Sequence, residues 1–130
     1  MAQQVFITGA TSGIGLEVAT QLHKAGWKVF ATGLQRDDFS VLEYGIEKMP
    51  MDLGDEDSIE GVVKFLTNET GGRLDAVVNN AAMNVPAPLE HLAIRELWQQ
   101  FDVNVFGQLQ IVQSLLPMLK QSENPRIVNV

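Results

Sequence analysis

A group of glycines near the start of the chain has the spacing of a phosphate-binding turn. Residues 8–15 read TGATSGIG, with glycine at positions 9, 13 and 15. Glycines so placed permit a tight turn, let the main chain approach a pyrophosphate, and let a helix pack closely on a strand. The N–H groups and positive dipole end of a following helix then attract the phosphates. The segment therefore predicts a site for the pyrophosphate of NAD or NADP.

The residues around this segment supply the strand and the helix that such a site requires. Residues 5–8 form a short apolar run, and residues 14–25 carry apolar side chains at helical spacing before Gly26 ends the helix. Three glycines without this context would be equally typical of an ordinary turn. The strand before them and the helix after them favour the binding site.

Strand and helix patterns alternate along the rest of the chain. Ser58 is expected to cap a second helix, which Gly71 and Gly72 end, and a polar connection at residues 35–44 holds at most a short helix near 40–43. A long helix is expected over residues 94–120. Further strands are expected at residues 29–31, 46–51, 74–78 and 127–130. The order predicts an α/β fold, a doubly wound parallel sheet of about five strands in a single domain over residues 1–130.

Composition narrows the classes of function. The chain has 130 residues, a formal net charge of -7 and no cysteine. The negative charge opposes binding to nucleic acid or to an anionic membrane surface, and no stretch is long enough to span a bilayer. His23 and His91 do not have metal-ligand spacing, so no metal site is expected. The lack of cysteine suits a reducing compartment, and the expected location is cytoplasmic.

Several motifs, in the right order, make the chain resemble the short-chain dehydrogenase/reductase family. TGATSGIG matches the family's TGxxxGxG, and residues 79–82 (NNAA) match its NNAG, with alanine in place of the last glycine. Asn104, within DVNVFG, matches the asparagine counted among the family's four catalytic residues. The resemblance covers essentially the whole chain. It implies a Rossmann-type fold and NAD(P)-dependent hydride transfer between an alcohol and a ketone.

The resemblance also implies a set of cofactor-binding residues. Asp52 matches the acid that contacts the adenine ring, and the segment after the fourth strand would lie along the ribose and nicotinamide side. Asn104 would help to hold a water that relays protons to the catalytic lysine. The implied cofactor-binding set is Gly9, Thr11, Ser12, Gly13, Ile14, Gly15, Asp52, Leu53, Asn80, Ala81 and Ala82.

The aspartate and the asparagines that carry the resemblance also have purely structural explanations. Asp52 precedes a helix, where aspartate commonly serves a turn or a cap. Asn79 and Asn80 at a strand end equally well satisfy backbone groups, and both roles are compatible. Asn104 is expected in mid-helix, where asparagine has poor propensity, so a functional role is favoured over a polar residue facing solvent.

The residues after the second strand bear on the choice between NAD and NADP. NAD-preferring folds usually place an acid at the tip of this strand, whereas an arginine accommodates the 2′-phosphate of NADP. No acid stands at the tip here, and Arg36 is the only cation nearby. Asp37 and Asp38 follow it and are alternative partners for its charge. NADP is therefore expected, with NAD as the alternative.

The family's proton-transfer residues are not found at their places in the chain. The family places a serine after the fifth strand and a YxxxK tyrosine and lysine about one helix later, beyond Val130. Tyr44 and Lys48 also read YxxxK, but Gly45 and the third strand break any helix between them, so this match is coincidental. We therefore expect the front part of such an oxidoreductase, truncated relative to the family and inactive without the remainder that would act on a small carbonyl or alcohol. The alternative is a non-catalytic dinucleotide-binding or protein-interaction module.

The long helix carries apolar side chains on two sides, which indicates burial on both. One stripe is expected to cover the sheet. The resemblance implies that the other packs against a second subunit in a homo-oligomer, while a neighbouring helix of the same protein is the alternative. The first stripe is Ile94, Leu97, Trp98, Phe101, Val105, Leu109, Val112 and Leu116, and the second is Val103, Phe106, Ile111, Leu115 and Met118.

Overall fold

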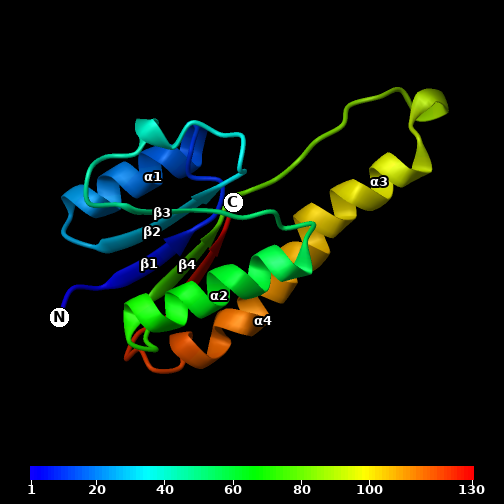
Figure 1. Cartoon of the computed structure of the whole chain (residues 1–130). Helices are drawn as coiled ribbons and strands as arrows, with labels where there is room; N and C mark the ends of the chain where they lie inside the picture. Colours follow the sequence, from blue (N-terminus) through cyan, green and yellow to red (C-terminus); the bar gives the residue numbers. More distant parts are fainter.

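Five parallel strands form the centre of the protein (Figure 1). A computed structural model describes all residues, 1–130. The strand order is β3-β2-β1-β4-β5, and every neighbouring pair is parallel. The strands are β1 (Gln4–Ile7), β2 (Lys28–Gly33), β3 (Glu47–Pro50), β4 (Ala76–Asn79) and β5 (Arg126–Asn129).

Helices cover both faces of this sheet, as Figure 1 shows. Helix α1 (Gly13–Lys24) lies on one face, and α2 (Glu56–Thr70) and α4 (Gln108–Leu119) lie side by side on the other. Successive residues of a strand point to opposite faces. Val5 and Ile7 accordingly belong to the apolar core beneath α1, and Phe6 belongs to the core beneath α2 and α4. The predicted doubly wound fold is confirmed.

The strand order creates a crevice at one edge of the sheet. From β1 the chain winds outward through β2 to β3, and it then returns to place β4 on the other side of β1. In open α/β sheets the connections diverge at such a switch point, and ligands bind there, outside the carboxyl ends of the strands. The glycine segment follows β1 at this position.

The start of α2 differs from the sequence-based expectation. Asp55, and not Ser58, is the N-cap residue, and its carboxylate accepts hydrogen bonds from the N–H groups of Asp57 and Ser58 at 3.0 and 3.4 Å. Ser58 lies inside the first turn, where its hydroxyl accepts from the Asp52 N–H. The end of the helix is as predicted, since Gly71 adopts the left-handed conformation with φ of 65°.

The predicted helix over residues 94–120 is interrupted. It consists of α3 (Ile94–Phe101), a π-helical segment over residues 102–107, and α4. Short 3-10 turns lie at residues 39–41, close to the predicted short helix, and at residues 89–91. Helix α3 extends beyond the sheet in Figure 1. None of these helices combines the length and apolar character that a bilayer crossing requires.

Candidate functional site

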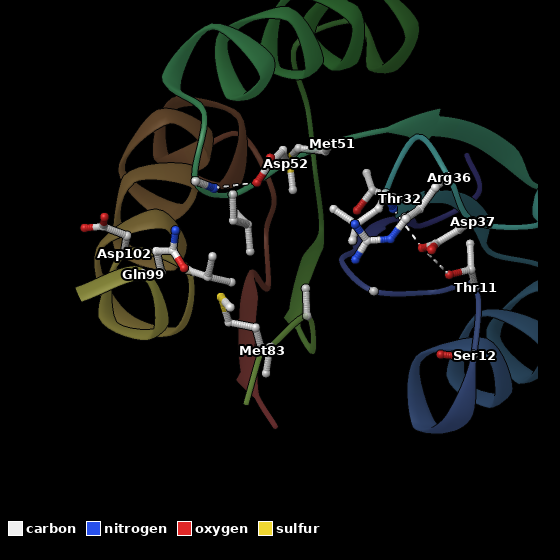
Figure 2. Close-up of a pocket in the computed structure, with 18 residues that line it drawn as sticks. Thr11, Ser12, Thr32, Arg36, Asp37, Met51, Asp52, Met83, Gln99 and Asp102 are labelled. Atoms are coloured by element: carbon white, nitrogen blue, oxygen red, sulfur yellow. Dashed lines mark hydrogen bonds between the residues drawn. The ribbon is translucent and has the colours of Figure 1, made fainter. Parts of the chain in front are cut away.

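A cleft of about 790 Å³ lies at the carboxyl ends of the central strands. Figure 2 shows Thr11, Arg36 and Asp37 on one side of it and Gln99 and Asp102 on the other. Eight of the residues that the sequence indicated for cofactor binding line this cleft. They are Gly9, Thr11, Ser12, Arg36, Asp52, Leu53, Ala81 and Ala82.

The glycine turn needs glycine for steric reasons. Gly9 has φ of 63°, in the left-handed region, and a Cβ on it would lie 2.8 Å from the Cα of Ala81. A Cβ on Gly15 would overlap the carbonyl oxygen of Gly9 and the side-chain nitrogen of Asn80. The turn, the first residues of α1 and the segment after β4 are therefore packed main chain against main chain.

The first turn of α1 is left without hydrogen-bond acceptors. Ser12 is the N-cap residue but makes no side-chain capping bond, and the first turn contains no acid. The N–H groups of Gly13, Ile14 and Gly15 have no partner, because the first bond back to the cap runs from Leu16. These three residues do not line the cleft but form the helix end beside Ser12, and the Ile14 side chain is 62% exposed. Free N–H groups at a helix start are suited to an anion.

Asn80 and Thr8 hold the glycine turn after β1 to the segment after β4. The Asn80 side-chain amide donates to the carbonyls of Thr8 and Gly9 at 3.2 and 2.9 Å. The Thr8 hydroxyl oxygen accepts from the N–H groups of Asn80 and Ala81 at 3.0 and 2.9 Å. Asn79 is buried, and its amide donates to Asn129 on β5. Both asparagines thus have the structural role, and Asn80 acts on the glycine turn itself.

Asp52 and Leu53 form another part of the cleft wall. One carboxylate oxygen of Asp52 accepts from the Gly54 N–H at 2.8 Å, which is the turn role weighed for this residue. The same residue lines the cleft, so its turn role and its exposure to a ligand coexist. Leu53 is buried at 6% exposure beneath it.

The Arg36 guanidinium is free of the two acids that follow it in the chain. The three ion pairs of the structure do not include Arg36. The Asp37 carboxylate instead accepts from the Thr11 hydroxyl and the Leu34 N–H, each at 2.8 Å. The pKa of Asp38 lies below its ordinary value of 3.8. The larger cause is the hydrogen bond from the Ser40 hydroxyl, and the bond from the Ser40 N–H adds to it. Arg36 is the only basic side chain that lines the cleft.

Asn104 lies in the π-helical segment and binds a neighbouring loop. Its carbonyl oxygen accepts from the Met83 N–H at 2.8 Å, and its amide donates to the Met83 carbonyl at 2.7 Å. One turn later, Gln108 donates to the carbonyl of Ala81. The alternative of a polar residue facing solvent is therefore wrong for Asn104. This residue fixes the segment after β4, which forms the floor of the cleft, without itself lining it.

The second YxxxK pair takes no part in the cleft. The Tyr44 side chain is fully exposed, and the Lys48 ammonium group donates to the carbonyl of Leu42. Lys48 belongs to β3, as the sequence indicated. Neither residue lines the cleft.

The sequence did not indicate several residues of the cleft. The sequence offers Asp37 only as a partner for the charge of Arg36. No motif marks Gln108, which contacts the Ala81 carbonyl beside the cleft. Helix α3 and the π-helical segment also contribute residues to the cleft. The unexpected lining residues include Asp37, Met83, Gln99, Asp102 and Val103.

Comparisons with known proteins agree with this geometry. The family model described as short chain dehydrogenase matches residues 3–130. A 3-amino-tetrahydro-pyrrolizinone reductase of Xenorhabdus hominickii is 37% identical over 98% of this chain and 45% of its own length. Retinol dehydrogenase 8 of Bos taurus is 34% identical over 97% of this chain and 43% of its own length.

Solved structures have the same fold. A short-chain dehydrogenase from Streptomyces avermitilis superposes with a TM-score of 0.88 at 28% identity, over 99% of this chain and 48% of that one. The ligand-free aldohexose dehydrogenase of Thermoplasma acidophilum gives a TM-score of 0.87 at 26% identity, over 98% of this chain and 48% of that one. The chain spans about half the length of the relatives it matches. With its glycine turn, its parallel sheet and this family match over nearly every residue, the chain belongs to the short-chain dehydrogenase family.

Proposed function

We propose that this chain forms the cofactor-binding part of an NADP-dependent oxidoreductase that interconverts an alcohol and a ketone. The main support for this proposal is the first turn of α1. Its N–H groups are unpaired beside a cleft at the switch point of the sheet. The dinucleotide would supply the hydride when bound. The chain's own residues bind and orient it.

The glycine turn fits the pyrophosphate of a dinucleotide. A side chain on Gly9 or Gly15 would fill the space in which the main chain meets the loop after β4, and the open helix end lies alongside. We assign the phosphates to this helix end and the adenine side to Asp52 and Leu53. The ribose and nicotinamide side is assigned to Ala81 and Ala82, with Asn80 acting through the turn that it holds.

Arg36 supports NADP over NAD. Its guanidinium lines the cleft, and Asp37 and Asp38 are occupied by other donors. A free guanidinium forms strong charge-assisted hydrogen bonds to a phosphate. We therefore assign the 2′-phosphate of NADP to Arg36.

Direct titration of the purified protein with NADPH and NADH tests this assignment. Arg36→Ala is expected to weaken NADPH about tenfold to a hundredfold, because a charge-assisted bond contributes roughly 1.5–3 kcal/mol. NADH affinity is expected to change less than twofold. Arg95→Ala is the matched control, because Arg95 is an exposed arginine of α3 that does not line the cleft. An equal loss for both dinucleotides would remove Arg36 from the specificity site.

We retain Asn104 as the counterpart of the family's catalytic asparagine. Its two bonds to Met83 position the main chain at the floor of the cleft, so its contribution here is to orient that segment. The redox function is tested with this chain together with the remainder that the family implies. NADPH oxidation by that protein is followed against a panel of small ketones and aldehydes. Dinucleotide binding without turnover of any carbonyl would favour the non-catalytic module instead.

We also propose a homo-oligomer that forms through the exposed stripe of the α3 to α4 helix. Trp98 is 63% exposed, Phe101 48% and Leu109 55% in the single chain, although all three are large apolar side chains. Light scattering after size exclusion tests this proposal. Phe101→Glu is expected to shift the mass toward the monomer, whereas Val41→Glu, on an exposed apolar residue of the β2 to β3 connection, is expected to leave it unchanged.

A further inference from the structure

One carboxylate oxygen of Asp37 joins two loops of the cleft. It accepts hydrogen bonds from the Thr11 hydroxyl and the Leu34 N–H, both at 2.8 Å, and Figure 2 shows the bond to Thr11 as a dashed line. Thr11 lies in the glycine turn after β1, and Leu34 is the first residue after β2. Thr11 and Asp37 are 26 residues apart in the sequence.

The surrounding packing shows that this contact is built into the fold. A Cβ on Gly33 would lie 2.5 Å from the Thr11 methyl carbon and 2.9 Å from the Asp37 oxygen. The end of β2 therefore leaves room for the two side chains to meet. The main chain closes the same junction, because the Ala10 N–H donates to the Thr32 carbonyl at 2.8 Å.

The bond to Asp37 also determines what Thr11 offers to a ligand. A threonine hydroxyl has one proton to donate and two lone pairs that accept. The proton of Thr11 is committed to Asp37, so the hydroxyl presents only acceptor capacity to the cleft that it lines. A phosphate oxygen is itself an acceptor and does not match it, whereas a sugar hydroxyl donates and does.

We propose that Asp37 is a positioning residue of the dinucleotide site. It clamps the glycine turn to the β2 loop and holds the Thr11 hydroxyl as an acceptor for a ribose hydroxyl of the dinucleotide. The proposal rests on the proposed binding of a dinucleotide. It differs from a direct contact between the Asp37 carboxylate and the cofactor.

The decisive comparison is between Asp37→Asn and Asp37→Ala, since both remove the charge and only asparagine keeps an oxygen that can accept from Thr11 and Leu34. Relative to Asp37→Asn, Asp37→Ala is expected to weaken NADP and NAD by the same factor, about fivefold to tenfold in Kd. Thr11→Val is expected to cause a similar loss, and the double variant Thr11→Val/Asp37→Ala no further loss, because both changes break one interaction. Thr67→Val removes a threonine hydroxyl of α2 outside the cleft and is expected to bind like the parent.

Other outcomes would overturn the proposal. If Asp37→Ala, compared with Asp37→Asn, weakens NAD while leaving NADP unchanged, the carboxylate acts directly on the ribose. A lower Tm with unchanged Kd for both dinucleotides would make the bond merely structural. Hydrogen exchange of the Leu34 amide in the ligand-free protein separates this question from dinucleotide binding. The amide is expected to exchange faster in Asp37→Ala than in Asp37→Asn, and equal rates would disprove the clamp even if neither dinucleotide binds.

Discussion

Helices α1 and α2 both follow a strand at the same edge of the sheet, yet their first turns are opposite in chemistry. The α2 terminus is closed by its own residues, because the Asp55 carboxylate caps two N–H groups and Glu56 and Asp57 add negative charge. The α1 terminus has no capping bond and no acid, and glycine occupies two of its first three positions. Both ends attract negative charge through the same backbone dipole. Only α1 leaves that attraction available to a ligand.

The difference shows why position alone does not identify a binding site. The connection after β3 reaches the same edge as the connection after β1, but an internal carboxylate already occupies the place of an anion. A helix start becomes a candidate site when its capping residue leaves the N–H groups unpaired and a cleft gives access to them. The following changes to the chain test whether this contrast governs binding.

Gly15→Ala is expected to have the largest effect. The new methyl group would overlap the Gly9 carbonyl and the Asn80 amide, which separates α1 from the turn. We expect dinucleotide binding to fall below detection by calorimetry, and stability to fall by about 1–3 kcal/mol, as in overpacked sites. Gly61→Ala is the control, because nothing lies within 4 Å of a Cβ at this position in α2. The idea fails if both variants bind equally well.

Ser12→Asp would make the start of α1 resemble that of α2. Ser12 already has the extended conformation of a cap residue, with φ of -158° and ψ of 165°. The carboxylate is expected to stabilise the helix by about 0.5–1 kcal/mol and to weaken dinucleotide binding roughly tenfold or more by repelling the phosphates.

Comparison with Ser12→Asn separates the effect of the negative charge in Ser12→Asp from the effect of capping the helix. The amide caps the helix without a charge, so only the aspartate variant should show a loss that shrinks as salt is added. Equal affinities of the two variants at low ionic strength would contradict an anion site at α1.

Asp55→Ala removes the cap of α2 and is expected to affect stability alone. Loss of an N-cap costs about 1 kcal/mol, so the denaturation midpoint should fall while dinucleotide Kd stays within twofold. Asp55→Asn preserves the capping oxygen and should recover most of the loss. A large change in Kd for the alanine variant would mean that the α2 terminus also serves the ligand.

Ser40→Ala is expected to give the smallest effect, at the 3-10 turn capped by Asp38. The Ser40 hydroxyl and N–H hold the pKa of Asp38 below 3.8, and the variant removes the hydroxyl bond, so the pKa should rise toward that value. Because the folded pKa is the lower one, the stabilisation is present above the unfolded pKa and is lost as pH falls through the folded pKa. Carboxyl NMR titration measures the shift, and an unchanged pKa would assign it to the backbone bond alone.

The sequence predicted the sheet and the glycine turn well because both depend on local patterns. Short apolar runs such as residues 5–7 and 76–78 indicate the strands, and glycine spacing reflects steric need at the turn. The sequence predicts the α2 cap three residues too late, because the run from Asp55 to Ser58 offers several capping side chains within one turn. Pattern alone did not separate them.

Features that depend on tertiary contact were not visible in the sequence. The π-helical segment over residues 102–107 has the same apolar spacing as a regular helix, and its contact through Asn104 to Met83 is visible only in the structure. The bond between Thr11 and Asp37 joins loops from different strands, and nothing in either loop indicates its partner. The stripe on α3 was recognised as apolar, but its exposure in the single chain followed only from the fold.

The central place of β1 also bears on how the protein is made. Among the five strands, β1 comes first in the sequence, yet one of its two neighbours is β4, with Val5 paired to Ala76. The middle of the sheet therefore cannot close until β4 has been synthesised, and until then one edge of β1 is unpaired. Contacts this distant in sequence slow folding and favour aggregation of the nascent chain. Placing the phosphate-binding turn at the centre of the sheet therefore prolongs the time for which β1 is unpaired during synthesis.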